Sequence, residues 1–347
     1  MTTTPSLEFA AKLDRVRRWL QQEGHQAAEL TRYSWVAWLL CGAEARVLAA
    51  ADRASCSVLV TRDRVVAATN NIEAPRLRDE EAPDLPIEWT VTNWWEAPAE
   101  ARGVEPPVRL RFSLLEPEVE RARRLSRDTG EAIEAAARSL APGLTEHEIA
   151  ARMAERAFAR GIVPVGLFVA ADERAKLYRH PLPGPKRAER NAVLSMVVRR
   201  GGLHSSVTRT VSFGPPCDEM LRRHRAVTAV HAAMLGASRP GITLDQVFGV
   251  AQRAYADQGF PDEWRHHHQG GPTGYEPREA RAAPGSSLTL EANQLVAWNP
   301  TIRGSKSEET ALVTAQGVEL LTRTGEWPAV DGPLPLADIL VLCPVIP

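Results

Sequence analysis

The sequence predicts a two-domain protein whose larger, C-terminal domain is of mixed α+β class. Three observations support this prediction. The chain has 347 residues, a length that suggests two domains more readily than one. A stretch rich in Gly and Pro, Arg102–Pro107, is typical of a linker between residues 1–115 and residues 116–347. Beyond it, a Gly turn followed by a capped helix occurs twice, which indicates a duplicated half-domain.

Residues 1–115 alternate between helical and strand patterns. Leu7–Gln22 has helical apolar spacing and stops before Gly24, and Asn71–Glu80 can form another helix. Short runs with strand character lie at Ser57–Val60, Val65–Ala68 and Ile87–Val91. We therefore expect a small α/β domain at the N-terminus.

The second domain is expected to begin with a long amphipathic helix, Glu116–Leu140. Pro142-Gly143-Leu144-Thr145, with Glu148 behind it, opens a helix that stops at Gly161. The same pattern recurs 98 residues later as Pro240-Gly241-Ile242-Thr243 with Gln246, and that helix stops at Gly259. Each copy has a Thr N-cap and a capping-box partner at N3. Strand-like runs follow the two copies: Val163–Ala171, Leu194–Arg200, His204–Phe213, Leu295–Trp298 and Thr310–Val313.

Composition excludes several classes of protein. The chain is 44% hydrophobic and 24% charged, with a formal net charge of −1, so bulk charge predicts no nucleic-acid or membrane-surface partner. Its four cysteines, Cys41, Cys56, Cys217 and Cys343, form no CxxC pair, which argues against disulfides and thiolate zinc sites. The polar start and the lack of an apolar run near roughly 18 residues predict a cytoplasmic protein without a signal peptide or membrane span.

Four motifs in the second domain occur in the order and at the spacing of a known family. They are Ser205-Ser206-Val207-Thr208-Arg209-Thr210, His267-His268-Gln269-Gly270, Asn299-Pro300, and Ser307-Glu308-Glu309-Thr310-Ala311-Leu312-Val313-Thr314. In that order they resemble the S-D-x-T-R-T motif, the segment leading to the metal-binding His, the E-P-G turn and the closing E-D-T-x-L-V-T strand of the creatinase, prolidase, aminopeptidase P and methionine aminopeptidase family. Leu13–Arg46 resembles the start of the small domain in creatinase and prolidase. The resemblance covers nearly the whole chain. It implies a pita-bread domain with an internal pseudo-two-fold repeat, preceded by a small α/β domain of the creatinase type.

The resemblance also implies where metal ligands would lie. Metal-binding members use Asp, Asp, His, Glu and Glu to hold two divalent ions. These positions fall on Ser195, Ser206, Gly271, Asn299 and Glu308. Only Glu308 keeps its carboxylate, and neutral or absent side chains at the other positions cannot balance the charge of two dications. We therefore expect a degenerate metal site and no bound metal or other cofactor.

Two groups of histidines are candidates for chemistry. His180, in Arg179-His180-Pro181, resembles a family His that contacts substrate; the structural alternative is a loop His beside a Pro. In the run His266-His267-His268, a strand conformation would place His266 and His268 on one face and His267 on the other. A new metal site there would need further ligands, so packing and hydrogen bonding among the rings is the favoured interpretation. The candidate catalytic residues are His180, His267, His268 and Glu308.

Further residues are candidates for substrate binding, each with a structural alternative. Gly270 and Gly271 allow close backbone approach to a ligand, or form a tight turn that continues to Tyr275. Arg278 and Glu279 fall where prolidases carry His-Glu, and Arg278 could clamp a carboxylate or pair with Glu279 or Glu308. Lys306 is expected on the same face as Glu308, and Arg209 more often holds the sheet together in such motifs. With Asn299, the full set is Arg209, Gly270, Gly271, Tyr275, Arg278, Glu279, Asn299 and Lys306. Trp298 precedes Asn299 on the opposite face of the strand and is expected in the core instead.

Three functions remain open at this point. The resemblance to creatinase implies that the fold can hydrolyse a C–N bond without metal, here in a small peptide-like or carboxylate-bearing substrate. An Xaa-Pro dipeptidase with a non-standard metal site around His266–His268 is an alternative. A non-catalytic pseudo-peptidase that binds a peptide or small anion is another. The resemblance further implies a homodimer whose ligand is a small molecule or short peptide.

Overall fold

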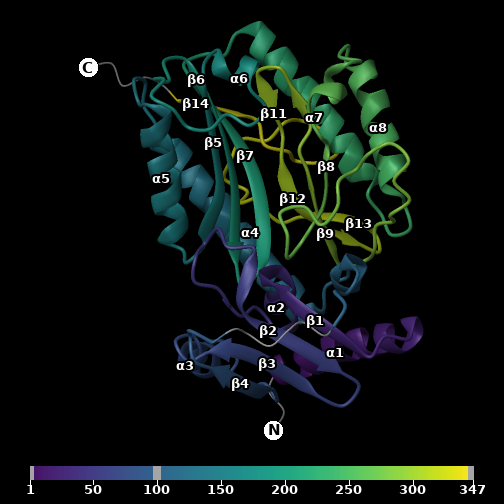
Figure 1. Cartoon of the computed structure of the whole chain (residues 1–347). Helices are drawn as coiled ribbons and strands as arrows, with labels where there is room; N and C mark the ends of the chain where they lie inside the picture. Colours follow the sequence, from purple (N-terminus) through teal and green to yellow (C-terminus); the bar gives the residue numbers. More distant parts are fainter. Residues whose placement is uncertain (1–3, 97–102, 343–347) are drawn as a thin grey trace. The chain divides into compact units, whose positions relative to one another are not determined.

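The computed structural model describes residues 4–96 and 103–342. The chain divides into two compact units, Met1–Arg121 with Arg200–Leu203 and Ala122–Arg199 with His204–Pro347 (Figure 1). Of the expected linker, Arg102 lies outside the described residues, as does Cys343 among the cysteines. No helix in the described part of the chain is long and apolar enough to cross a membrane.

The first unit is a small α/β unit, as its alternating patterns predict. Its α-helices are α1 (Thr4–Glu23), α2 (Tyr33–Leu39) and α3 (Ala74–Arg76). Helix α3 continues into a π-helical turn, η1 (Leu77–Glu81), and a 3-10 turn, η2 (Val108–Arg111), lies near the end of the unit. The strands β1 (Ala27–Arg32), β2 (Arg53–Thr61), β3 (Val65–Asn70) and β4 (Glu88–Thr92) form one sheet in sequence order. Only the β3–β4 pair in this sheet is parallel.

The larger unit contains two halves, each of which includes one helix with a capping box. The long helix α4 (Glu116–Arg138) leads into the first half, which contains α5 (Glu146–Phe158), β5 (Val163–Ala171), α6 (Arg174–Leu177), β6 (Asn191–Arg200) and β7 (Leu203–Phe213). The second half contains α7 (Asp218–Ala237), α8 (Leu244–Asp257), the 3-10 turn η3 (Glu263–His266), β8 (Gly270–Thr273), β9 (Gln294–Trp298), β10 (Thr301–Ile302), β11 (Ser305–Lys306), β12 (Glu309–Thr314), β13 (Gly317–Leu320) and β14 (Ile339–Leu342).

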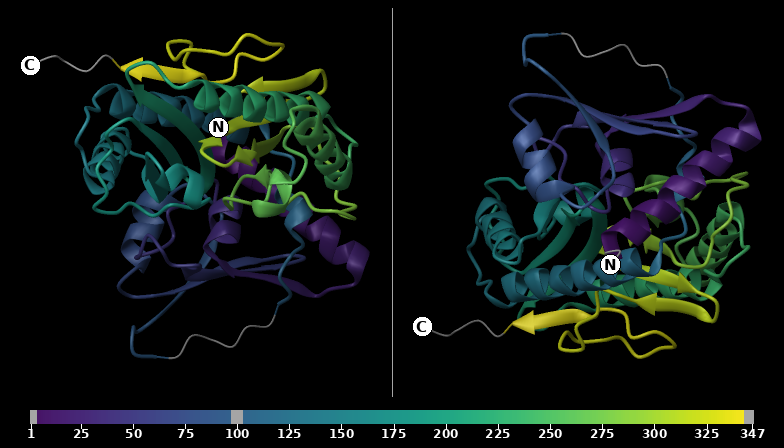
Figure 2. Two further views of the ribbon diagram at one scale, coloured as in Figure 1. Left: turned by 90° about the horizontal axis from the view of Figure 1, so that it is seen from above. Right: turned by 90° about the horizontal axis from the view of Figure 1, so that it is seen from below.

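The strands of this unit form two four-stranded sheets and a short hairpin. One sheet has the order β14-β7-β6-β5, with β14 parallel to β7, and the other has the order β13-β12-β9-β8 with antiparallel pairs. Strands β10 and β11 form the hairpin. Helix α5 packs along β5, and α7 packs against α8 and against β9, β10 and β11 (Figures 1 and 2). The predicted mixed α+β architecture is therefore confirmed.

Both predicted capping boxes form. Thr145 Oγ1 accepts the backbone N–H of Glu148 at 3.2 Å, and Glu148 returns a carboxylate to the backbone N–H of Thr145 at 2.7 Å. Thr243 and Gln246 make the corresponding pair of bonds at 3.1 and 2.9 Å. These bonds satisfy backbone donors that a helix leaves unpaired at its N-terminus, so the two repeated signals in the sequence set the two helix starts.

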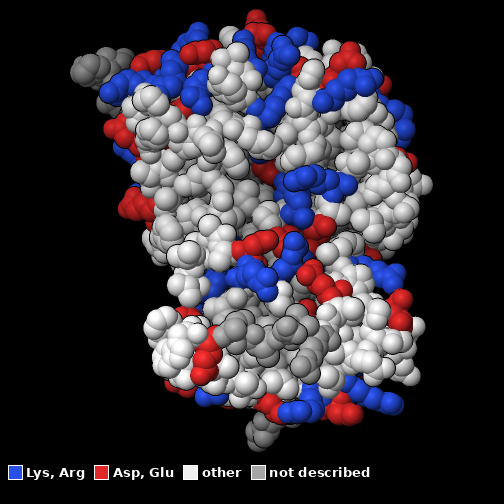
Figure 3. Space-filling view, in the orientation of Figure 1, with Lys and Arg blue, Asp and Glu red and all other residues white. Residues whose placement is uncertain are grey.

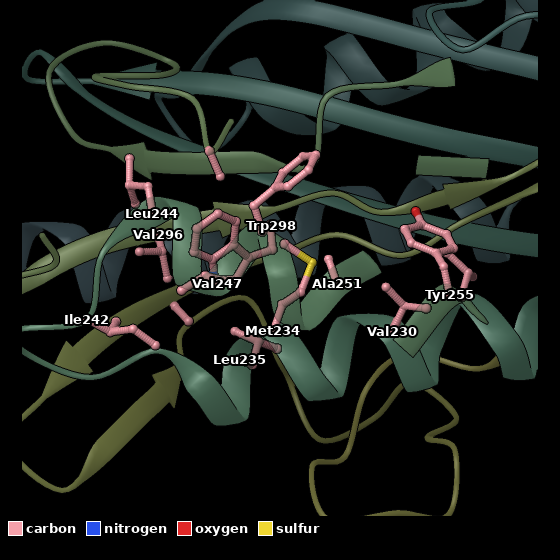
Figure 4. Close-up of a cluster of buried hydrophobic side chains, with 14 of the residues drawn as sticks. Val230, Met234, Leu235, Ile242, Leu244, Val247, Ala251, Tyr255, Val296 and Trp298 are labelled. Carbon is pink, nitrogen blue, oxygen red and sulfur yellow. The ribbon is translucent and has the colours of Figure 1, made fainter. Parts of the chain in front are cut away.

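A hydrophobic core beneath the second sheet positions the strand that leads to Asn299. Trp298 and Val296 of β9 lie among Met234 and Leu235 of α7 and Val247 of α8 (Figure 4). The buried indole N–H of Trp298 donates to Ser238 Oγ at 2.9 Å, so its polar atom is satisfied. The prediction that Trp298 belongs to the core is confirmed.

Candidate functional site

Three imidazole rings meet in the larger unit. His180 lies between α6 and β6, and His267 and His268 follow η3. Nε2 of His180 and Nε2 of His267 are 3.1 Å apart, and the centroids of the His267 and His268 rings are 4.5 Å apart. The run His266–His268 does not form the strand considered from the sequence. Instead, η3 ends at His266, and the backbone is extended at His267. His266 is consequently exposed, whereas His267 and His268 both lie against His180.

All three rings of this cluster are held neutral at neutral pH. Burial and the nearby charge of Lys306 lower the pKa of His267 to about 2. Burial and the charge of Arg278 lower the pKa of His268 to about 4, and burial with Lys306 lowers the pKa of His180 as well. The backbone N–H of Gly270 donates to His268 Nδ1 at 3.2 Å, so the proton of that neutral ring lies on Nε2.

Glu308, where the resemblance implies that a family carboxylate is kept, is paired with two cations. Lys306 Nζ lies 2.7 Å from Oε2, and Arg278 Nη2 donates to Oε1 at 2.9 Å. Thr208 Oγ1 donates to Oε2 at 3.1 Å. Although burial opposes the charge, Lys306 and Arg278 hold the pKa of Glu308 at about 2. Two positive charges thus share one carboxylate, as the sequence interpretation of Lys306 and Arg278 suggests.

These contacts do not fit a pair of divalent metal ions. Lys306 Nζ also lies 3.2 Å from Ser195 Oγ, and Arg278 Nη1 reaches Ser206 Oγ at 3.5 Å. The cations thus bond to the side chains that stand where the family resemblance implies two aspartates. A Cβ atom at Gly271, where the resemblance implies the His ligand, would lie 2.3 Å from the carbonyl oxygen of Ala280. Neither the charge nor the space for the family's ligands is present.

The histidine cluster has some features of a metal site, since nitrogen atoms of its three rings lie within 4.8 Å of one another. Two observations oppose an ion there. His268 directs its lone pair at Nδ1 toward the N–H of Gly270 and carries a proton on Nε2. The positive charges of Lys306 and Arg278 that disfavour protonated rings would disfavour a dication in the same place.

Arg209 lies apart from the candidate site. Its guanidinium has no solvent exposure and pairs with Glu134 of α4 and Glu309 of β12, both at 2.8 Å. This geometry favours the structural alternative, in which Arg209 joins α4 to the sheets.

The glycine-rich turn also takes its structural alternative. A Cβ at Gly270 would lie 2.2 Å from the carbonyl oxygen of Ala297 on β9, so the close backbone approach here is to the chain itself. Tyr275 is fully buried. Glu279 accepts the backbone N–H of Tyr275 at 2.9 Å and thereby stabilises the turn.

Asn299 is buried, and its Oδ1 has no hydrogen-bond partner within residues 4–96 and 103–342.

Sequence reasoning missed two polar residues at the site. Thr208 Oγ1 lies 2.8 Å from Ser195 Oγ and also donates to Glu308. Its position inside the Ser205–Thr210 motif was the signal that could have identified it as a site residue. His231 of α7 is fully buried and lies 2.8 Å from Ser307 Oγ, directly behind Glu308. The signal available for His231 was its spacing of four residues from Val227 and from Leu235, which places it on the apolar face of α7. On the face of the larger unit shown in Figure 3, a cluster of Lys and Arg atoms lies within an otherwise largely uncharged middle region.

Comparison with known proteins agrees with this fold. The model of metallopeptidase family M24 matches residues 120–315, more than half of the chain, and the chain belongs to this family. An uncharacterized peptidase of Staphylococcus aureus is 25% identical over 225 residues, which is 62% of this chain and 63% of that protein. The match therefore spans less than two thirds of the relative's length.

Solved structures resemble the chain over most of its length. The Xaa-Pro dipeptidase from Bacillus anthracis has a TM-score of 0.75 and 17% identity, with 96% of this chain and 100% of that chain covered. The prolidase from Pyrococcus horikoshii OT3 has a TM-score of 0.76 and 18% identity, with 90% and 98% covered. The predicted pita-bread family and fold are confirmed by these matches.

Proposed function

We propose that this member of family M24 hydrolyses a C–N bond in a small, carboxylate-bearing substrate without the family's metal pair. The observation that carries the proposal is the arrangement around Glu308, where Lys306 and Arg278 share one carboxylate. One positive charge remains uncompensated at a site where these two side chains are only 11% and 12% exposed. A partly desolvated site of this charge favours an anionic ligand and disfavours metal ions.

Lys306 has the capacity to bind that anion. An ammonium group has three N–H donors, and the described contacts of Lys306 use Glu308 and Ser195. The third donor is therefore available to a carboxylate of the substrate. Charge-assisted bonds of this kind are stronger than those between neutral groups.

The neutral histidines supply the proton transfers. His180, whose Nε2 lies 3.1 Å from that of His267, would accept a proton from water as its oxygen attacks the carbon of the C–N bond. The resulting imidazolium would pass that proton to the departing nitrogen, which leaves as an amine. A pKa of about 2 makes His267 too weak a base near neutral pH, so its role is to hold the ring of His180 in place. Glu308 cannot supply a proton near neutral pH because its pKa is held at about 2. Its role in this proposal is to hold Lys306 and Arg278 in place.

A screen for turnover with a chelator control tests the proposal. The full-length protein is assayed on Xaa-Pro dipeptides, N-acyl amino acids and small amidines, with and without EDTA. We expect turnover that EDTA does not change, that His180→Ala abolishes and that His267→Ala strongly reduces. His266→Ala is the matched control, because His266 belongs to the same run but is exposed, and it should retain activity. Turnover that EDTA abolishes and a divalent metal restores would overturn the proposal.

A second candidate is a pseudo-peptidase that binds a small anion without catalysis. It is favoured by the full engagement of Glu308, whose ionised oxygens already accept bonds from Lys306, Arg278 and Thr208. Saturable binding of a carboxylate together with no turnover on any substrate would select this candidate.

A further inference from the structure

A small cavity adjoins the candidate site in the larger unit. Its volume is about 30 Å³. Phe168, Val193, Pro181 and Ala170 contribute apolar walls, whereas the polar part of the lining comes from Ser195, Lys306, Arg179, Thr301 and Ser305. The ring of Phe168 also contacts the ring of His180, with 5.6 Å between their centroids. The cavity is thus lined by Lys306 and, through Phe168, adjoins the ring of His180.

The size of the cavity limits what can enter it. One water-sized group occupies roughly 10–15 Å³ on this measure. A cavity of about 30 Å³ therefore accommodates two or three non-hydrogen atoms. The walls formed by Phe168, Val193, Pro181 and Ala170 offer no hydrogen bonds from their side chains, so an apolar group gains more there than water does.

The segment that borders the cavity is also apolar on its outer side. Leu177, Tyr178 and Leu182 flank His180 in the chain and are 65%, 52% and 70% exposed. Tyr178 is in addition a wall of the cavity. Exposed apolar side chains grouped in this way beside a cavity are more typical of a ligand-binding region than of ordinary surface.

We propose that this cavity receives a short apolar group of the substrate, two or three carbons long, attached next to the anionic group that Lys306 binds. This inference rests on the proposed function and narrows it to substrates that combine a carboxylate with a compact aliphatic group. Lys306 would fix the carboxylate, and Phe168 and Val193 would enclose the aliphatic part. Longer chains would exceed the space, and a substrate without the group would lose its apolar contacts.

Binding of straight-chain carboxylates to the full-length protein tests this inference without any need for turnover. Acetate, propionate, butyrate and hexanoate are titrated by calorimetry at neutral pH. We expect affinity to peak at propionate or butyrate, with hexanoate about 10-fold weaker, since one misplaced methylene in an apolar pocket changes binding by about this factor or more. Affinity that rises steadily with chain length, or that ignores it, would overturn the inference.

Variants of the wall make the test specific. Val193→Ala removes two methyl groups from the cavity wall, and the preferred chain should lengthen by about two carbons. Val169→Ala is the matched control, because Val169 is equally buried on β5 but does not line the cavity, and it should keep the wild-type preference. Ala170→Val narrows the cavity and should shift the preference toward acetate, which provides a second variant if Val193→Ala does not fold. An unchanged preference in a folded Val193 or Ala170 variant would overturn the inference.

The outcomes separate this inference from the proposed function. A chain-length optimum without turnover on any substrate supports the cavity's role and counts against hydrolysis. Equal binding of all the carboxylates leaves the anion site in place and overturns the cavity's role alone. No binding of any carboxylate overturns both the cavity's role and the proposed preference for carboxylates.

Discussion

Replacing Lys306 with methionine tests the charge arrangement on which the proposed function depends. Methionine keeps an unbranched side chain, one atom shorter than that of lysine, and removes the ammonium group. In the wild type that group lies 2.7 Å from Glu308 Oε2, and the exposed fractions of the two side chains are 11% and 2%. Breaking a buried ion pair costs about 3–5 kcal/mol because the remaining charge is left buried without its partner. Arg278 and Thr208 still contact Glu308, so the carboxylate keeps a charged partner. We therefore expect a smaller loss, about 2 kcal/mol, for the charge-assisted bond that is removed.

Lys176→Met provides the matched control. Its ammonium lies 3.0 Å from Glu219, but these side chains are 52% and 46% exposed, and an exposed pair contributes about 1 kcal/mol or less. Urea unfolding at pH 7 measures both variants. In a cycle with Glu308→Gln, the double variant should lose at least about 1 kcal/mol less than the sum of the single variants, because neighbouring charges couple. A loss in Lys306→Met no larger than that in Lys176→Met would refute the reasoning.

Three further predictions concern stability. Burial lowers the pKa of His231 from 6.5 to about 3, so below pH 6.5 the unfolded chain binds a proton that the folded chain does not. This residue should therefore lower the unfolding free energy by about 1.4 kcal/mol for each pH unit as the pH drops from 6.5 toward 3. In urea titrations, the unfolding free energy of His231→Gln should fall less steeply with pH than that of the wild type. Equal slopes would contradict the lowered pKa of His231. Gly271→Ala should lower the unfolding free energy by about 3 kcal/mol, because its Cβ would meet the carbonyl of Ala280. In the control Gly241→Ala the Cβ meets nothing within 4 Å, and the loss should be about 1 kcal/mol. Similar melting temperatures for the two variants would argue against the close approach of Gly271 to Ala280. Thr145→Ala should cost about 1 kcal/mol in urea unfolding through loss of the N-cap, and Thr145→Ser should restore most of it.

Much of the fold could be predicted because its signals are local. The capping residues Thr145 and Thr243 define helix starts through bonds to residues three positions away. The periodic pattern beginning at Glu116 becomes α4. Trp298 was predicted in the core because it alternates with Asn299 on a strand that ends there. Each of these depends on neighbours within one or two turns of helix or a few residues of strand.

The details of the site depend on contacts between distant parts of the chain. His180 meets His267 across 87 residues, and Arg209 meets Glu134 across 75. Whether Gly271 approaches a ligand or its own chain depends on the path of the backbone at Ala280. The end of η3 at His266 decided which histidines of the run share the site. Side-chain identity alone does not determine such placements, whereas the nearness of Lys306 to Glu308 was predictable because they are only two residues apart.

The metal content of the purified protein tests the central claim most directly. The full-length chain is purified without chelators, supplied with excess Mn²⁺, Co²⁺ or Zn²⁺, passed through a desalting column and measured by inductively coupled plasma mass spectrometry. With Lys306 and Arg278 bonded to Glu308, Ser195 and Ser206, we expect far less than one divalent ion per chain. Two tightly bound ions per chain would contradict the account.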